Sequence, residues 1–412
     1  MDKARRKLKN KAMRRTWIMA VAISLFTLQI NVIHAATSNP KPGAACTKLG
    51  ASQVYKGLKF TCSKSGKKLI WNKGVSFKLE ESCNKKNETA LIGGKTAMCT
   101  LINEKLTWQI DTYQKLLGAW QDTLAYKKAQ PLPNAALDVR YSPLVNRKIV
   151  DAIVASLKSS SQFWQAQFLP AKPFPTLFFT EKEKSWFGDQ MTKLGLAQKC
   201  IDQQLNQFDE EVARNGENAN AAGYAGCDDV TFFDFYIGTG RDDVNTDTLK
   251  VGAHEYTHSG QFGALTNAGG EFAPCWFIEG GAEFYGITLS ALKDSDVYKM
   301  RQQHVWEPYM FGFKGLAFMD PNSIAQFIEE NGINYNHQVC GPNGAYPVGA
   351  VATEYLFLQQ GQTGILKFME DIKINHDFKS SIQKIYGISW EQMKNEMSDY
   401  IKLVIAQTPK PD

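Results

Sequence analysis

Several absences narrow what this 412-residue sequence can be. None of its eight cysteines forms a C-x-x-C pair, which argues against a zinc site built from thiolates. No stretch after residue 36 is long and apolar enough to cross a bilayer. Disorder throughout is also excluded, because 21% of the residues are charged and 12% are aromatic, as in globular proteins. The length favours two or three structural units.

Summed over the chain, a net positive charge is lacking outside the first fifteen residues. Residues 1–15 hold eight Lys or Arg against one acid, a local charge of +7, whereas the whole chain carries +6. The remainder is therefore near −1. A nucleic-acid partner is not expected, because the net basic charge of the whole chain is a property of this leader.

The leader itself has the order of an export signal. Its basic start is followed by an apolar run over 17–33 and then by His34, Ala35 and Ala36. This order predicts a secretory signal over residues 1–36, and hence a secreted or cell-surface protein with no membrane span after signal removal. An uncleaved anchor is the alternative, since the basic segment is long, but polar residues within the apolar run weaken it.

All eight cysteines lie downstream of the leader, and their even number in an exported chain favours disulfides over metal ligands. Proximity along the chain predicts four pairs, although sequence alone does not settle the connectivity. The predicted pairs are Cys46–Cys62, Cys83–Cys99, Cys200–Cys227 and Cys275–Cys340.

A repeat of 37 residues occupies the front of the chain, where Cys46, Cys62 and Trp71 recur as Cys83, Cys99 and Trp108. Turn-forming glycines and short alternating runs between these residues predict two small β-hairpin modules. We define module 1 as residues 37–75 and module 2 as residues 76–110. Each is too small to fold without its own disulfide.

Two interpretations apply to these modules. Trp71 and Trp108 could be stacking platforms for a cell-wall or other ligand, or each could pack on its own disulfide. One aromatic residue per hairpin is usually its core, so packing is favoured. The many lysines of module 1 suit an anionic wall polymer, yet exposed lysines are more often a solvated face.

Residues 111–412 have the pattern of a single, mainly helical domain with a small sheet ahead of residue 246, which is an α+β order. Prolines near residue 131 predict a linker, and residues 215–226 a loop. Predicted helices cover 111–128, 144–168, 246–264, 275–292, 322–331, 346–360, 363–374 and 389–406. Predicted strands cover 176–179 and 230–237.

One motif carries chemistry. His254-Glu255-Tyr256-Thr257-His258 places two imidazoles four residues apart, on the same face of a helix, where both can bind one metal ion. Glu255 lies beside the first imidazole and is placed to accept a proton from the attacking water.

A second motif follows, Trp276-Phe-Ile-Glu279-Gly280-Gly-Ala-Glu283, with twenty residues between His258 and Glu279. Together the two motifs resemble the gluzincin zinc metallopeptidases, the superfamily of thermolysin-like peptidases and zinc aminopeptidases. The resemblance implies a zincin-like fold over about 140–407, with His254, His258 and Glu279 as ligands of Zn²⁺. Two histidines, one carboxylate and an open position make such a site catalytic and not structural.

The resemblance also implies roles for two further residues. Glu283, four residues beyond Glu279, should accept the free ring N–H of a ligating histidine, His254 by preference. Tyr346, in a segment Tyr-x-x-Gly-Ala, should donate to the oxyanion of the tetrahedral intermediate. A disulfide between Cys275 and Cys340 would fix these elements to each other. His304 is expected to be packing, and His337 could overhang the site.

One family feature is missing. The aminopeptidases carry Gly-x-Met-Glu-Asn upstream to hold the substrate's N-terminus, and nothing here matches it. An endopeptidase is therefore the favoured interpretation, with the substrate backbone adding to an edge strand over 230–237.

Two functions follow from the sequence. The first is an exported zinc-dependent metallopeptidase acting on a peptide or protein substrate, with cell-wall contact through residues 37–110. The alternative is a cell-surface binding protein that keeps the peptidase fold and has lost useful turnover.

Overall fold

The computed structural model describes residues 39–411 apart from 56–57, 74, 77, 93–94, 133–136, 169–173, 217–221, 227–231, 241–243, 270–271, 309–312 and 333–344. The predicted signal over 1–36 therefore lies outside the described residues. Among the residues that are described, no helix is long and apolar enough to cross a membrane.

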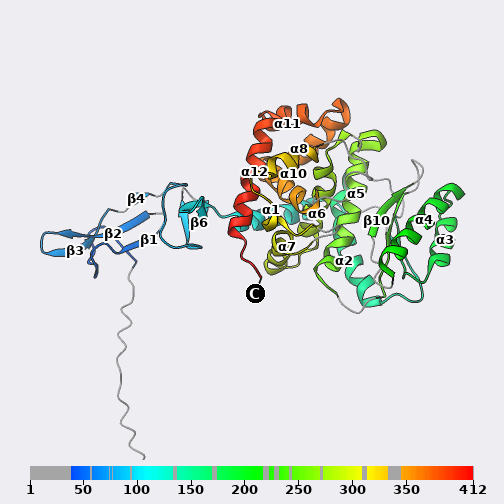
Figure 1. Cartoon of the computed structure of the whole chain (residues 1–412), viewed down its shortest axis with the longest axis horizontal. Helices are drawn as coiled ribbons and strands as arrows, with labels where there is room; N and C mark the ends of the chain where they lie inside the picture. Colours follow the sequence, from blue (N-terminus) through cyan, green and yellow to red (C-terminus); the bar gives the residue numbers. More distant parts are fainter. Residues whose placement is uncertain are drawn as a thin grey trace, which may run out of the picture.

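The chain forms two small antiparallel sheets followed by a larger, mainly helical body, in agreement with the expected α+β class. Figure 1 shows the two small sheets to one side of the helical body, and a four-stranded sheet within that body on the far side.

Both front modules have more strands than the predicted hairpin, four in the first sheet and three in the second. In module 1, β1 pairs with one edge of β2, and β3 and a short β4 pair with successive parts of its other edge. In module 2, β5 pairs with β6 and β6 with β7. The strands are β1 (Ser52–Tyr55), β2 (Leu58–Ser65), β3 (Lys68–Trp71), β4 (Val75–Ser76), β5 (Thr89–Ile92), β6 (Lys95–Ile102) and β7 (Lys105–Ile110).

A disulfide closes each module as predicted, Cys46–Cys62 in the first and Cys83–Cys99 in the second. In the strand register Cys62 lies opposite Trp71, and the corresponding pair of module 2 is aligned in the same way. Trp71 is only 7% exposed and packs in a cluster with the disulfide. The packing interpretation of the tryptophans is therefore correct, because a stacking platform needs an exposed ring.

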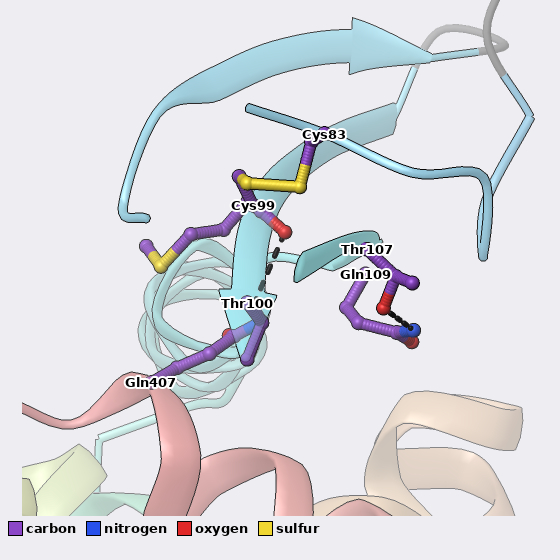
Figure 2. Close-up of a disulfide and its surroundings, with 7 residues drawn as sticks. Cys83, Cys99, Thr100, Thr107, Gln109 and Gln407 are labelled. Carbon is purple, nitrogen blue, oxygen red and sulfur yellow. Dashed lines mark hydrogen bonds between the residues drawn. A yellow bond between two sulfur atoms is a disulfide. The ribbon is translucent and has the colours of Figure 1, made fainter. Parts of the chain in front are cut away.

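Module 2 is fastened to the helical body by one buried amide (Figure 2). Gln407, the last residue of α12 (Trp390–Gln407), donates to Thr100 Oγ1 over 2.9 Å and to the carbonyl of Ile110 over 2.8 Å. Its oxygen accepts from the backbone N–H and the hydroxyl of Thr112, which begins α1 (Thr112–Ala129). A single side chain thus joins β6, β7, α1 and α12.

The sheet of the helical body has the strand order β10-β11-β9-β8, with β8 (Leu137–Tyr141), β9 (Phe174–Phe178), β10 (Ala222–Gly226) and β11 (Phe232–Tyr236). Two predictions fail here. The loop expected over 215–226 contains β10, and β11 is not an edge strand because β10 and β9 pair with it on either side. Strand β10 was missed because glycine and alanine have low strand propensity. The strand is stabilised by its pairing with the aromatic strand β11.

Most of the predicted helices are present, with boundaries that differ by a few residues. The strongly patterned ones are α1, α2 (Arg147–Phe168), α5 (Thr246–Gly269), α6 (Cys275–Ser290), α8 (Ile324–Glu330), α10 (Ala345–Asn375) and α12. A non-helical Gly361 at φ 63° interrupts α10 and separates the two helices predicted there. The helices outside the predicted ranges are α3 (Lys184–Lys193), α4 (Gln198–Asn215), α7 (Asp294–Trp306) and α11 (Phe378–Tyr386).

Packing places α5 and α6 at the centre of the body. One face of the sheet carries α3 and α4 through a phenylalanine-rich cluster, and the other face packs on α5. On the opposite side α6 crosses α10 closely enough that a Cβ on Gly280 would overlap the backbone of Gly349. The two helices therefore meet backbone to backbone.

Candidate metal centre

Three side chains of the type that binds zinc converge between α5 and α6. The Nε2 atoms of His254 and His258 lie 3.9 and 3.5 Å from the same oxygen of Glu279. One ligand atom from each residue lies within 4.8 Å of the others, and all three residues are at most 6% exposed. Helical spacing accounts for this, because His254 and His258 are one turn apart on α5 and α6 packs across that face.

The orientation of His254 is set by Glu283. Its Nδ1 lies 2.9 Å from Glu283 Oε2. A carboxylate only accepts, so Nδ1 of a neutral imidazole must be the donor. The Nε2 lone pair of His254 then faces Glu279. This is the contact that the sequence assigned to Glu283.

His258 is oriented by an amide. Gln261 donates through Nε2 to the carbonyls of Phe277 and Ile278 at 3.1 and 2.9 Å, which leaves its oxygen as an acceptor. That oxygen lies 3.0 Å from Nδ1 of His258, so Nδ1 carries the hydrogen. The Nε2 lone pair of His258 therefore also faces Glu279.

These contacts make the donor set fit zinc. Both imidazoles expose Nε2 lone pairs to one pocket, and a carboxylate oxygen completes a three-residue set of the catalytic type. Ligands at the usual zinc distances in tetrahedral geometry are separated by roughly 3.4 Å. The 3.5 Å between His258 and Glu279 is close to that value, and the 3.9 Å from His254 needs only a small contraction.

Glu283 is the hub of a buried charge cluster. Besides His254 it contacts Lys250 Nζ, and its Oε1 lies 2.6 Å from Nε2 of His304. Burial would raise the pKa of Glu283, but Lys250, His254 and His304 outweigh burial and hold that pKa well below its ordinary value. Glu283 is therefore an anion at 1% exposure. His304 packs against it, as expected, and burial lowers the pKa of His304.

The ligand pocket itself favours positive charge. Burial would lower the pKa of His258, but the charge of Glu279, with smaller contributions from Glu255 and Gln261, raises it above the ordinary value. A pocket that stabilises a proton against burial has an excess of negative charge. The same excess stabilises a divalent cation.

The sheet side of the pocket holds two polar residues that the sequence did not suggest. Asp234 on β11 is fully buried, and the hydroxyl of Tyr236 donates to it over 3.4 Å. Burial, and then the charge of Glu255, raise the pKa of Asp234 well above its ordinary value. Burial, and then the charges of Asp234 and Glu255, do the same for the pKa of Tyr236. The surroundings of Asp234 and Tyr236 therefore disfavour the charged form of both groups.

Tyr346 lies beside the ligands. It belongs to the first turn of α10, is half-buried, and its ring stacks on that of His254 with centroids 5.7 Å apart and planes 17° apart. The close approach of Gly280 and Gly349 holds α10 at this distance. The two adjacent glycines of α6 pack against different helices. Gly280 meets α10, whereas Gly281 faces Gln261 of α5.

The two remaining disulfide predictions fall partly outside the described residues. Cys200 and Cys275 are each disulfide-bonded, but their predicted partners, Cys227 and Cys340, lie outside the described residues. His337 also lies outside them.

Two residues that hold the site together were missed from the sequence. Lys250 is four residues before His254, and Gln261 is three residues after His258. Both therefore share the ligand face of α5, and this spacing was the available indication. Their long-range partners, Glu283 for Lys250 and the carbonyls of Phe277 and Ile278 for Gln261, lie on α6, so the contacts could not be foreseen.

No family model and no curated protein matches the chain. Three solved structures are weakly similar to it, each with a TM-score of 0.29. A mutant M1 zinc metallopeptidase from Deinococcus radiodurans is 12% identical, with 69% of this chain and 52% of that chain covered. A two-domain M1 zinc metallopeptidase mutant bound to L-arginine is 11% identical, with 90% and 62% covered. An M1 zinc metallopeptidase from Deinococcus radiodurans is 12% identical, with 91% and 75% covered.

The chain thus spans about half to two thirds of the first two of these structures. Likenesses of this size do not assign it to a family.

Proposed function

We propose that the protein is an exported zinc-dependent metallopeptidase of the zincin-like fold. The observation that carries this proposal is the pair of fixed tautomers, which direct two Nε2 lone pairs and a Glu279 oxygen into one buried, negatively charged pocket. Three acceptor atoms turned toward one another in a buried pocket are costly unless a cation lies between them.

In this proposal His254, His258 and Glu279 hold zinc, while Glu283 and Gln261 keep the two imidazoles in the binding tautomer. A bound zinc ion supplies a Lewis acid that lowers the pKa of water to about 7. Glu255 takes the proton of the attacking water and delivers it to the leaving amine. Tyr346 donates its phenol hydrogen to the developing oxyanion, a position that its stacking on His254 supports.

The strand available to an extended substrate is β10. It packs against α5, and among the described strands it pairs on one side only, with β11. Main-chain hydrogen bonds along such an edge bind a peptide without requiring a free amino terminus. Together with the missing amine-anchoring motif, this supports an endopeptidase. The leader sequence and the disulfides, which suit an oxidising compartment, support export.

The test is Glu255→Gln. This variant should bind zinc stoichiometrically and lower kcat for a peptide substrate by about 10²–10⁴-fold, because a general base is lost and no ligand is changed. Zinc content by atomic absorption and a mass-spectrometric digest of a peptide library measure the two effects. Unchanged turnover would remove Glu255 from the mechanism.

The second candidate function is a cell-surface binding protein without useful turnover, which the two front modules favour. A peptide-library digest with and without a chelator separates the candidates. Zinc binding with no cleavage of any peptide would favour the binding protein.

A further inference from the structure

The two front modules share a fold but differ in charge. Module 1 contains eight lysines and no Asp or Glu, whereas module 2 contains five lysines and four Glu. Residues 111–412 contain 26 basic and 36 acidic residues, a net charge of −10. A strongly basic module therefore precedes a nearly neutral one and an acidic helical body.

Folding does not require the positive charge of module 1. Module 2 repeats the three main strands of module 1, without a counterpart of β4, and has the same disulfide position and a buried tryptophan at a net charge of +1. Eight like charges in a unit of this size repel one another and destabilise it. The lysines therefore serve something other than the fold.

These lysines are available to a partner. All six whose exposure is described are exposed, namely Lys41, Lys48, Lys64, Lys67, Lys68 and Lys73. Module 1 has no carboxylate, so none of them can form an ion pair within the module. Three of them flank the β2–β3 turn at Gly66, and β2 and β3 lie at the outer end of the molecule, away from the helical body (Figure 1).

The side chains on the surface of module 1 limit the chemical class of partner that it can bind. Phe60 and Trp71 are buried at 3% and 7% exposure, so neither ring can stack on a base or a sugar. Module 1 has no arginine, which is the residue suited to bidentate recognition of a single fixed phosphate or carboxylate. Mobile point charges without a stacking ring suit a flexible polymer whose anionic groups repeat along its length.

We propose that module 1 binds a flexible polyanion of the kind that carries repeated phosphate or carboxylate groups at a cell surface. Module 2, fixed to the body through Gln407, then acts as a spacer that holds the acidic body at a set distance from the polymer. This inference does not rest on the proposed peptidase activity.

The first experiment measures binding of the full chain to immobilised long-chain polyphosphate, to poly-glutamate, and to dextran as an uncharged control. We expect binding to the two polyanions and none to dextran. With up to six ion pairs, the affinity should fall by up to about 10³-fold between 50 and 200 mM salt, as counterion release requires. Tighter binding to polyphosphate would identify phosphate as the preferred group, and equal binding would identify charge density alone; both support the proposal.

The second experiment makes the same change of charge, three lysines to glutamates, in module 1 and, separately, in module 2. Lys64→Glu/Lys67→Glu/Lys68→Glu in module 1 should weaken polyphosphate binding at least tenfold. Lys85→Glu/Lys86→Glu/Lys95→Glu, at exposed positions of module 2, is the matched control and should weaken it less than about threefold. Thermal melting and zinc content, which should not change, show that both variants are folded.

Three results would overturn the proposal: no binding of the unmodified chain to either polyanion at 50 mM salt, binding that is insensitive to salt, or equal weakening by the two triple variants. The last would mean that only the total charge of the chain matters. Zinc content and peptide hydrolysis are unaffected by any of these outcomes, so failure here leaves the metallopeptidase proposal standing.

Discussion

Two fully buried carboxylates flank the candidate metal centre, one on its helical side and one on its sheet side, and their pKa values shift in opposite directions. Glu283 between α5, α6 and α7 is 1% exposed and its pKa lies well below the ordinary value. Asp234 on β11 is 0% exposed and its pKa lies well above it. Burial alone would raise both pKa values, so partners and not depth decide the charge.

The difference lies in what each carboxylate contacts. Glu283 forms an ion pair with the ammonium of Lys250 and contacts ring nitrogens of His254 and His304. Asp234 accepts a hydrogen bond from the hydroxyl of Tyr236, and the negative charge of Glu255 acts on it. The helical side therefore presents a fixed anion to His254, while the sheet side disfavours a second anion near Glu255. Four changes test this contrast.

The largest effect is expected from Glu283→Gln. The change leaves the ammonium of Lys250 buried without its counter-charge, which should lower the free energy of unfolding by about 3–5 kcal/mol. Zinc affinity should fall by about 10–100-fold, because His254 loses the acceptor that fixes its tautomer. Denaturant melts and zinc titration measure the two losses.

A matched control is Glu329→Gln in α8. Glu329 also collects three donors, from Lys379, Lys394 and Trp390, but its side chain is 38% exposed. This change should cost about 0–1 kcal/mol and leave zinc affinity unchanged. Equal costs at the two glutamates would contradict the importance of burial.

A smaller net effect is expected when both partners of the buried pair are removed. Lys250→Met with Glu283→Gln should recover at least about 2 kcal/mol of the stability lost in Glu283→Gln, because no unpaired charge remains. Zinc affinity should stay low, since His254 still lacks its anionic acceptor. Recovery of zinc affinity in the double variant would mean that Glu283 acts only on stability.

Next in size is Gln261→Leu, because the hydrogen bond that it removes involves a neutral amide and not a charged carboxylate. It should cost about 1–3 kcal/mol and about tenfold in zinc affinity, because His258 loses its acceptor. Gln302→Leu, which also removes a donor to a carbonyl, is the control and should leave zinc affinity unchanged. A loss of zinc affinity as large as that of Glu283→Gln would show that the two imidazoles are held equally firmly.

The smallest effect is expected from Asp234→Asn, because a neutral side chain replaces one that is already neutral. The expected cost in chelator-treated protein at pH 4 is below about 1 kcal/mol. As the pH rises above about 4, Asp234 ionises only in the unfolded chain, which favours unfolding of the unmodified protein. The variant should therefore gain relative stability by up to about 1.4 kcal/mol per pH unit until the raised native pKa is reached.

Denaturant melts of both proteins between pH 4 and pH 7 measure this slope. A relative stability that is flat with pH, or that falls, would show that Asp234 is ionised in the native state.

The sequence predicted those parts of the site that depend on local spacing. His254 and His258 repeat at one helical turn, and the second motif supplied Glu279; the structure brings all three together. The contact of Glu283 with His254 was also foreseen. The roles of Glu255 and Tyr346 in a reaction stay predictions, since they concern chemistry and not placement.

Long-range contacts could not be predicted. His304 comes from α7, a helix with no strong pattern in the sequence. The burial of Asp234 could be recognised only once β11 was known to lie inside the sheet. Strand β10 was missed because Ala and Gly carry no strand signature, and its order comes from pairing with β11. The front modules were predicted in more detail because a repeat shows the same constraints twice.

The glycine crossing of α6 and α10 has a consequence for motion. With the backbones at Gly280 and Gly349 in contact, neither helix can slide or roll against the other without a clash. Glu279 and Tyr346 should therefore move together, as parts of one rigid unit. We expect the pocket to widen through movement of the other side, the four-stranded sheet with α3 and α4.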